Sequence, residues 1–369
     1  MLLEKKKVAI VCYTGNSGLT DYSVSLARAL SKDCEVVLIT GRNATNYYQK
    51  FQFDIIKFFG RSRRYPLDVV RLFFYLLKIK PDVVLFQSWL KFPVADASLV
   101  ALLRFVGIDT AVTIHDVLPH YPKRWSRYEL SLYYRLFNKV IVNSEAAKVQ
   151  VANMGVINPI LVVPHGIYDL FDTKGLDKIG ARGLVPGVGV NDFVVLFFGR
   201  ITPRKGINLF LRLAARFVDQ KDCKFIVAGF NGMKDASFDD VAEYEALVRG
   251  ENVILKDGRV PFQDVQIYFS ASDVVVLPYV EGTTSGVIKL ALAFKRPVVA
   301  TNVGDISETL IFKFGELVEA NADVCDGLYD ALETVRGDYA SYHANAYDAC
   351  EYFSWERISI KYREHILLG

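Results

Sequence analysis

The sequence predicts an α/β protein made of two doubly wound, Rossmann-like domains that face each other across a cleft. Short β-branched runs alternate with segments of helical periodicity, the alternation stops near the middle of the chain, and it then begins again. With 369 residues the chain is long enough for two domains, each with its own core. Two successive series of this kind argue for two parallel sheets rather than one very large sheet.

Five apolar runs in the first half are expected to form buried parallel strands. They lie at residues 8–13, 36–40, 83–87, 110–115 and 140–143. Segments with helical periodicity separate them, including 21–31 and 67–79. We therefore expect residues 1–170 to form the first domain.

The second series follows the same rule. Its predicted strands lie at residues 193–198, 224–228, 253–255, 274–277 and 298–300. We expect residues 193–353 to form the second domain. Residues 171–192 are rich in Gly and Asp and lack sustained periodicity, which is typical of an interdomain linker.

Composition excludes a disordered chain, because 51% of the residues are hydrophobic and 23% are charged. The first residues do not have the pattern of a signal peptide, and no apolar run is long enough to span a bilayer. A cytoplasmic protein is therefore expected. Its net charge of +3 is uneven: residues 1–180 carry 24 Lys and Arg against 15 Asp and Glu. A basic first half favours an anionic partner there, although a solvated basic surface without a partner gives the same count. We expect no nucleic acid among the partners.

Two basic segments of the first domain are candidates for peripheral contact with an anionic membrane at the inner face of the plasma membrane. They are residues 57–65 and 121–128, and the second interleaves basic and aromatic side chains. The helix at 67–79 is expected to be buried against the sheet. Its narrow solvent stripe would contain Asp68, Arg71, Tyr75 and Lys78.

A turn rich in small residues follows the first predicted strand. Gly15, Ser17 and Gly18 lie in it, directly before a predicted helix. Small residues let a ligand approach the backbone, and the N–H groups at a helix start favour an anion. The turn lacks the full G-x-G-x-x-G spacing, so nothing indicates a dinucleotide.

Two cations follow the first strand of the second domain. Arg200 comes directly after the strand, and Lys205 lies five residues further on, just before a helix. A guanidinium, an ammonium and a helix N-terminus together favour a diphosphate. The alternative is a pair of solvated loop cations.

The loop after the strand at 274–277 begins with an acidic residue and continues with small residues. Glu281 opens it, and Thr284, Ser285 and Gly286 lead into an apolar helix. Hydroxyl and backbone donors at a helix start suit phosphate. Glu281 could equally be an ordinary surface residue.

These motifs, in this order, resemble the retaining glycosyltransferases of family 4, which have the GT-B fold of two Rossmann-like domains. Together with the turn at 15–18, the resemblance rests on TIHD at 113–116, VNSE at 142–145, VPHGI at 163–167, GRITPRKG at 199–206, VAG at 227–229, EGTTSG at 281–286, RPVVAT at 296–301 and FSWERI at 353–358. It covers nearly the whole chain. The resemblance also implies that a terminal helix at 354–369, opened by Trp355, joins the first domain.

The resemblance implies roles for the charged residues. Arg200 and Lys205 would hold the donor diphosphate and neutralise the leaving group, with no metal and no cofactor required. His115 would contact the transferred sugar, since it ends a strand and precedes Asp116; a core histidine is the alternative. Glu281 would contact sugar hydroxyls or the developing positive charge.

The resemblance assigns the remaining positions to the donor nucleotide. Gly18 would bring backbone close to the sugar phosphate, and Thr284, Ser285 and Gly286 would hold phosphate. The base would lie against two residues after the strand at 253–255, Arg259 and Val260.

Lys289 departs from the family pattern. The family has a second glutamate eight positions after the first, where it holds the ribose hydroxyls, and this chain has Lys289 there. A lysine has only donors and cannot accept two hydroxyl hydrogen bonds. The chain thus resembles a variant of the family that lacks this glutamate.

The leading hypothesis is a retaining glycosyltransferase. It would move a sugar from a UDP- or GDP-sugar to a glycan or lipid-linked acceptor in bacterial cell-surface polysaccharide biosynthesis. The alternatives are a non-catalytic relative that binds a nucleotide-sugar or a partner enzyme, and a sugar-nucleotide epimerase of GT-B shape.

Overall fold

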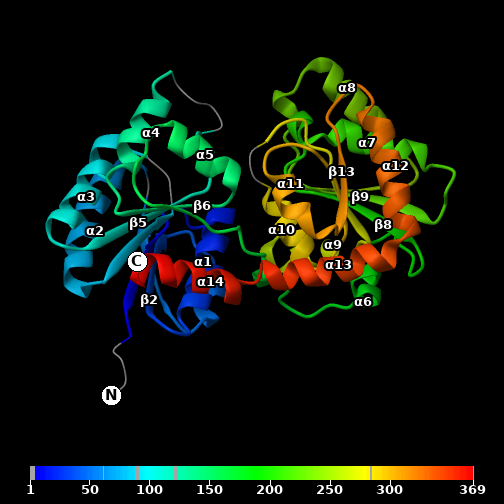
Figure 1. The fold of residues 1–369 in the computed structure, drawn as a ribbon. Helices are drawn as coiled ribbons and strands as arrows, with labels where there is room; N and C mark the ends of the chain where they lie inside the picture. Colours follow the sequence, from blue (N-terminus) through cyan, green and yellow to red (C-terminus); the bar gives the residue numbers. More distant parts are fainter. Residues whose placement is uncertain (1–4, 61, 88–90, 120–123, 283–284, 369) are drawn as a thin grey trace. The chain divides into compact units, whose positions relative to one another are not determined.

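The computed structural model describes residues 5–60, 62–87, 91–119, 124–282 and 285–368. The chain divides into two compact units. Unit 1 comprises Met1–Gly166 and Phe353–Gly369, and unit 2 comprises Ile167–Tyr352. Each unit is a parallel sheet with helices on both faces (Figure 1). This is the Rossmann-like architecture that the two series of strands predict.

The sheet of unit 1 has seven strands in the order β3-β2-β1-β4-β5-β6-β7. They are β1 (Lys7–Val11), β2 (Glu35–Gly41), β3 (Asp54–Phe59), β4 (Val83–Gln87), β5 (Asp109–Ile114), β6 (Lys139–Val142) and β7 (Ile160–Val162). Every pair is parallel, so all carboxyl ends lie along one edge.

Helices cover both faces of this sheet because its central strands are apolar on both sides. Figure 1 shows α2 and α3 on one side, and α1 with α14 on the other. The helices are α1 (Gly18–Leu30), α2 (Tyr65–Ile79), α3 (Pro93–Phe105), α4 (Ser126–Tyr134), α5 (Glu145–Asn153) and α14 (Trp355–Arg363).

Helix α14 completes the core of unit 1. The ring of Trp355 is buried and lies so close to Gly166 that a Cβ added there would be 2.7 Å from its Cζ2 atom. The hydroxyl of Tyr362 lies 2.7 Å from that of Tyr22 and 2.9 Å from that of Thr113. A segment remote in sequence is thus held by packing and by buried hydrogen bonds.

The sheet of unit 2 has six parallel strands in the order β10-β9-β8-β11-β12-β13. They are β8 (Phe193–Phe198), β9 (Cys223–Gly229), β10 (Val253–Asp257), β11 (Val274–Leu277), β12 (Val298–Thr301) and β13 (Gly315–Val318). The helices are α6 (Lys178–Gly183), α7 (Ile207–Arg216), α8 (Phe238–Leu247), α9 (Val265–Ala271), α10 (Gly286–Ala293), α11 (Ile306–Thr309), α12 (Val324–Gly337) and α13 (Tyr339–Tyr352). The main core cluster packs α7 and α12 against one face.

Three strands, β3, β7 and β13, were not expected from the sequence. All three lie at the edges of their sheets, and most of their residues are only half-buried. β3 and β13 contain charged residues and β7 has only three residues, so each gives a weaker pattern than a central strand. The fourth edge strand, β10, was expected.

Residues 171–192, expected as a linker, instead pack within unit 2. They contain α6, and Arg182 from this helix is buried. Its Nη2 atom lies 2.7 Å from Oδ2 of Asp273, which also accepts from the backbone N–H of Val194 at 2.7 Å. A buried ion pair fixes this segment although its sequence lacks periodicity.

Helix α2 also differs from the expectation. Asp68, expected in the solvent stripe, is buried, and its Oδ2 atom accepts from the backbone N–H of Gly60 at 3.0 Å. Arg71 and Lys78 are exposed as expected, but the outward surface also carries Leu67, Val70 and Phe74, all more than half exposed. The helix is apolar on two faces, so its periodicity could not decide which one meets the sheet. Among the described residues, no helix is long and apolar enough to cross a membrane.

Gly206 holds two loops of unit 2 together. Its φ is +72°, and an added Cβ would overlap the carbonyl oxygen of Pro278. We expect Gly206→Ala to lower the free energy of unfolding by at least about 2 kcal/mol more than Gly175→Ala. Gly175 also has a positive φ (+59°) but has no heavy atom near its added Cβ. Denaturant unfolding of both variants measures the difference, and equal losses would contradict the packing argument.

Candidate functional site

Three polar side chains meet at the carboxyl edge of the sheet in unit 1. His115 follows β5, Gln87 ends β4 and Asn143 follows β6. The Nε2 atom of His115 lies 2.8 Å from Oε1 of Gln87, and its Nδ1 atom lies 3.4 Å from Nδ2 of Asn143. The ring of Tyr22 packs edge-on against His115, with centroids 4.5 Å apart.

Burial lowers the pKa of His115 to about 4, although the charge of Asp116 opposes the shift. The imidazole is therefore neutral at pH 7. A neutral ring can donate from one nitrogen and accept at the other, as the two amide neighbours require.

The cluster around His115 has unused hydrogen-bonding capacity. Nε2 of Gln87 and Oδ1 of Asn143 are buried and have no hydrogen-bond partner among the described residues. Unsatisfied buried polar atoms are uncommon in folded proteins, and a polar ligand at this edge would satisfy them. Sequence reasoning missed both residues; the available signal was a polar side chain at the end of an apolar strand.

The turn after β1 is built by hydroxyl groups and by a close backbone contact. Ser17 caps α1, and its Oγ atom lies 2.7 Å from that of Thr14. A Cβ added at Gly15 would lie 2.6 Å from the carbonyl oxygen of Gly41. Gly15 is thus required for packing, whereas Gly18 is exposed at the first residue of α1.

In unit 2, the loops after β8 and β11 hold each other. The backbone N–H of Val280 donates to the carbonyl of Arg204 at 3.1 Å. Nζ of Lys205 lies 3.7 Å from the centroid of Tyr279, whose hydroxyl accepts from Oγ of Ser285 at 3.1 Å. Lys205 and Ser285 are therefore brought together around one aromatic ring.

Glu281 joins the same pair of loops. Its Oε1 atom lies 3.1 Å from Nε of Arg204, and its side chain is 69% exposed. Arg200, directly after β8, is exposed, and its Nε atom would lie 2.9 Å from a Cβ added at Gly232. The loops thus present a carboxylate and several cations at one edge of the sheet, as a nucleoside diphosphate-sugar would need.

The other predicted positions of unit 2 lie around these loops. Gly286 is the first residue of α10, where an added Cβ would be 3.2 Å from the ring of Tyr168. Arg259 is exposed and Val260 half-buried, and both follow β10 at the edge of the sheet. Thr284 lies outside the described residues.

Phe230 is a further candidate that the sequence did not single out. It follows β9, between the strands that lead to Arg200 and Arg259, and its side chain is 52% exposed. An exposed aromatic ring at this edge offers a stacking surface for a base.

Lys289 is turned into unit 2. It is buried on α10, and its Nζ atom donates to Oγ1 of Thr309 at 3.0 Å. Burial lowers the pKa of Lys289 well below its usual range, while the charges of Asp305 and Glu308 oppose the shift. Acidic side chains and Thr309 thus surround the amine where the family has its second glutamate.

Comparison with known proteins agrees with this architecture. Residues 16–169 match the family described as Glycosyltransferase Family 4, and residues 192–338 match the one described as Glycosyl transferases group 1. The crystal structure of HepE from Anabaena in complex with UDP superposes with a TM-score of 0.73 at 17% identity, covering 97% of this chain and 98% of that one.

Two curated relatives match over shorter stretches. A D-inositol 3-phosphate glycosyltransferase of Paenarthrobacter aurescens is 30% identical over 49% of this chain and 46% of its own length. An uncharacterized glycosyltransferase of Methanocaldococcus jannaschii is 31% identical over 36% of this chain and 33% of its own length. The chain thus spans less than half the length of these relatives.

Two parallel-sheet units of this kind make the protein a member of the GT-B fold class. Within that class, the chain belongs to the glycosyltransferases of family 4 and group 1.

The environment of Lys289 predicts a pH dependence of stability. Because its pKa is lowered in the folded protein, the unfolded chain binds the proton more tightly, and stability rises as the pH increases toward the ordinary lysine value. Lys289→Met removes this contribution. We expect the free energy of unfolding to rise more steeply from pH 7 to pH 10 in the wild type than in Lys289→Met. Parallel curves in denaturant titrations would show that burial does not perturb this amine.

Proposed function

We propose that the protein is a retaining glycosyltransferase that moves a sugar from a UDP- or GDP-sugar to a glycan or lipid-linked acceptor. Cell-surface polysaccharide biosynthesis is the proposed setting. The observation that carries the proposal is the joined pair of loops in unit 2, with Lys205 and Ser285 around Tyr279 and Glu281 paired with Arg204.

Unit 2 supplies the groups for the donor. Arg200 and Lys205 bind the diphosphate and neutralise its charge as the sugar departs. Backbone N–H groups at the start of α10, beside Ser285, donate to a phosphate oxygen, and Glu281 contacts the sugar. The relative HepE was crystallised with UDP and with UDP-glucose, which supports a nucleotide-sugar of this type.

The reaction exchanges one bond for another on the same face of the sugar. The bond from the anomeric carbon to the diphosphate oxygen breaks, and a bond to the acceptor oxygen forms. The acceptor proton passes to the leaving phosphate, which needs no cofactor and no metal in this proposal. Cationic side chains around the diphosphate lower the barrier because they stabilise the charge that develops on it.

Unit 1 supplies the groups for the acceptor and for the transferred sugar. His115 is neutral, so it can bind a sugar hydroxyl without adding charge beside the reacting carbon. The unsatisfied atoms of Gln87 and Asn143 add one donor and one acceptor at the same edge.

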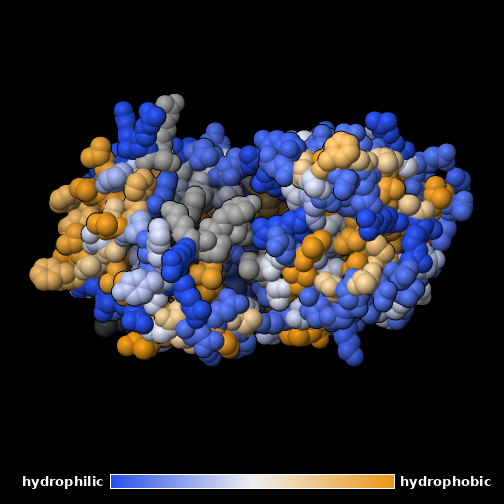
Figure 2. Space-filling view, turned by 90° about the horizontal axis from the view of Figure 1, so that it is seen from above, coloured by the Kyte–Doolittle hydropathy of each residue, from blue (hydrophilic) through white to orange (hydrophobic). Residues whose placement is uncertain are grey.

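The outer face of α2 and α3 supports contact with an anionic membrane. Figure 2 shows apolar surface gathered over the end of unit 1 where these helices lie. The exposed apolar side chains are Leu67, Val70, Phe74, Val94, Leu102 and Phe105. Exposed Arg63 and Arg64 precede α2. Apolar groups rimmed by cations suit the headgroup region of a bilayer.

Nucleotide binding tests the enzymatic proposal. We expect calorimetry with UDP, GDP and ADP to show binding of one nucleotide, weakened about tenfold or more in Arg200→Ala, because a charged hydrogen-bond donor is lost. Arg249→Ala removes an exposed arginine beyond α8 and serves as the control. If none of the three nucleotides binds, the transferase proposal fails in this form and the non-catalytic alternative gains support.

Vesicle flotation tests the membrane contact. We expect Phe74→Asp to reduce binding to vesicles of phosphatidylcholine and phosphatidylglycerol, because it places a carboxylate on the apolar face. The control is Ile311→Asp in unit 2, since Ile311 is 63% exposed and Phe74 is 64% exposed. Equal effects of the two substitutions, or no binding by the wild type, would argue against this face.

A further inference from the structure

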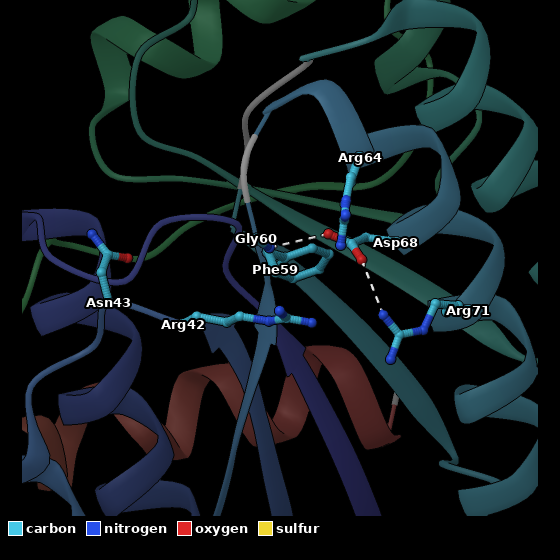
Figure 3. Close-up of a pocket in the computed structure, with 7 residues that line it drawn as sticks. All are labelled: Arg42, Asn43, Phe59, Gly60, Arg64, Asp68 and Arg71. Atoms are coloured by element: carbon cyan, nitrogen blue, oxygen red, sulfur yellow. Dashed lines mark hydrogen bonds and ion pairs between the residues drawn. The ribbon is translucent and has the colours of Figure 1, made fainter.

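A basic pocket of about 620 Å³ opens in unit 1, apart from the residues assigned to the donor and to His115. It lies at the carboxyl ends of β2 and β3 and at the start of α2. Its polar lining consists of Arg42, Asn43, Gly60, Arg64, Asp68 and Arg71 (Figure 3).

Three arginines from different elements reach this pocket. Figure 3 shows Arg42 and Arg71 extending toward each other from opposite sides, while Arg64 descends from the start of α2. Nε of Arg42 donates to the carbonyl of Phe58 at 3.2 Å, which fixes the side chain and leaves its terminal nitrogens available. The guanidinium of Arg64 has no hydrogen-bond or ion-pair partner among the described residues.

The positive charge of the pocket is only partly neutralised. Among the lining residues, three guanidinium groups stand against the single carboxylate of Asp68. That carboxylate is shared, because Oδ2 accepts from the backbone of Gly60 at 3.0 Å and Oδ1 lies 3.4 Å from Nη1 of Arg71. The start of α2 has no side-chain cap, so its N-terminal dipole adds to the positive potential. The pocket therefore favours a group with two negative charges.

The pocket adjoins the edge of the sheet where the acceptor is proposed to bind. Oδ1 of Asn43 lies within contact distance of a Cβ added at Gly15, so the pocket borders the turn after β1. The strand order places β2 three positions from β5, which leads to His115. With strands about 4.8 Å apart, this separation is roughly 14 Å.

We propose that the Arg42–Arg64–Arg71 pocket binds a phosphate group carried by the acceptor, at a distance of one or two sugar rings from the reacting hydroxyl. This assignment rests on the proposed function, since it names the class of acceptor. A guanidinium fork matches the geometry of phosphate oxygens, and three of them select a phosphate over a neutral glycan.

Titration of the full chain with inorganic phosphate tests the pocket directly. Arg42→Gln and Arg64→Gln should each weaken binding about tenfold or more, because each removes a charged donor. Arg63→Gln is the matched control, since Arg63 is exposed beside Arg64 and does not line the pocket. Arg64→Gln also guards against misfolding, because Arg64 makes no hydrogen bond or ion pair among the described residues.

A second arm identifies the source of the phosphate. Vesicles of phosphatidylcholine with and without phosphatidic acid replace inorganic phosphate in the same set of variants. A loss of vesicle binding in Arg64→Gln that Arg63→Gln does not share, with no effect in the soluble arm, assigns the phosphate to a lipid, because both arginines flank the membrane face but only Arg64 lines the pocket. Arg64 dependence in the soluble arm alone assigns it to a soluble acceptor. Dependence in both arms supports the shared chemistry.

The proposal is overturned if neither arm depends on Arg42 and Arg64, or if phosphate binding is lost only in Arg200→Ala, which would place the phosphate at the nucleotide site. Nucleotide calorimetry on the same preparations separates the two proposals. If no nucleotide binds while phosphate binding still depends on Arg64, the transferase proposal fails and the pocket remains.

Discussion

The arrangement of both units depends on how closely backbones approach at the carboxyl edge of a parallel sheet. Gly15 lies against Gly41 in unit 1, and Gly206 against Pro278 in unit 2, with no room for a Cβ in either contact. In a parallel sheet every loop that follows a strand leaves at this edge, so neighbouring loops compete for the same space. Because glycine has no side chain, the main chains of neighbouring loops can pack in direct contact at these positions. The polar side chains beside these contacts then have fixed starting points, which a chemical site requires.

Sequence patterns could predict the central strands and the edge strand β10, but not the other three edge strands, β3, β7 and β13. The runs at 83–87, 193–198 and 274–277 coincide with β4, β8 and β11, because buried strands are apolar on both faces. Strand β3 mixes polar and apolar residues, and it was not recognised. This gap also concealed the basic pocket. Its arginines can be placed together only once β3 is known to end at Phe59, one short loop before α2 begins at Tyr65.

Candidate site residues that directly follow strands could be predicted from the sequence, whereas the residues that pack against those site residues could not. Lys205 and Ser285 were expected near a phosphate, and the structure brings them together around Tyr279. The sequence offered no reason to choose Tyr279, since its role comes from a contact between loops far apart in the chain. Helix α2 illustrates a similar limit. Asp68 had the spacing of a solvent-facing residue, but a backbone N–H of the preceding loop keeps its carboxylate buried.

Because α14 packs in unit 1, the two units can complete their folding at different stages of synthesis. Unit 2 is one continuous segment, whereas unit 1 is interrupted and needs residues beyond Tyr352. A nascent chain on the ribosome can therefore fold unit 2 as soon as it emerges. Until Trp355 and Tyr362 have been synthesised, the apolar surface of unit 1 that they cover, around Tyr22 and Gly166, remains exposed to solvent. Chaperone dependence should consequently concentrate on the first part of the chain, which is translated early and completed last.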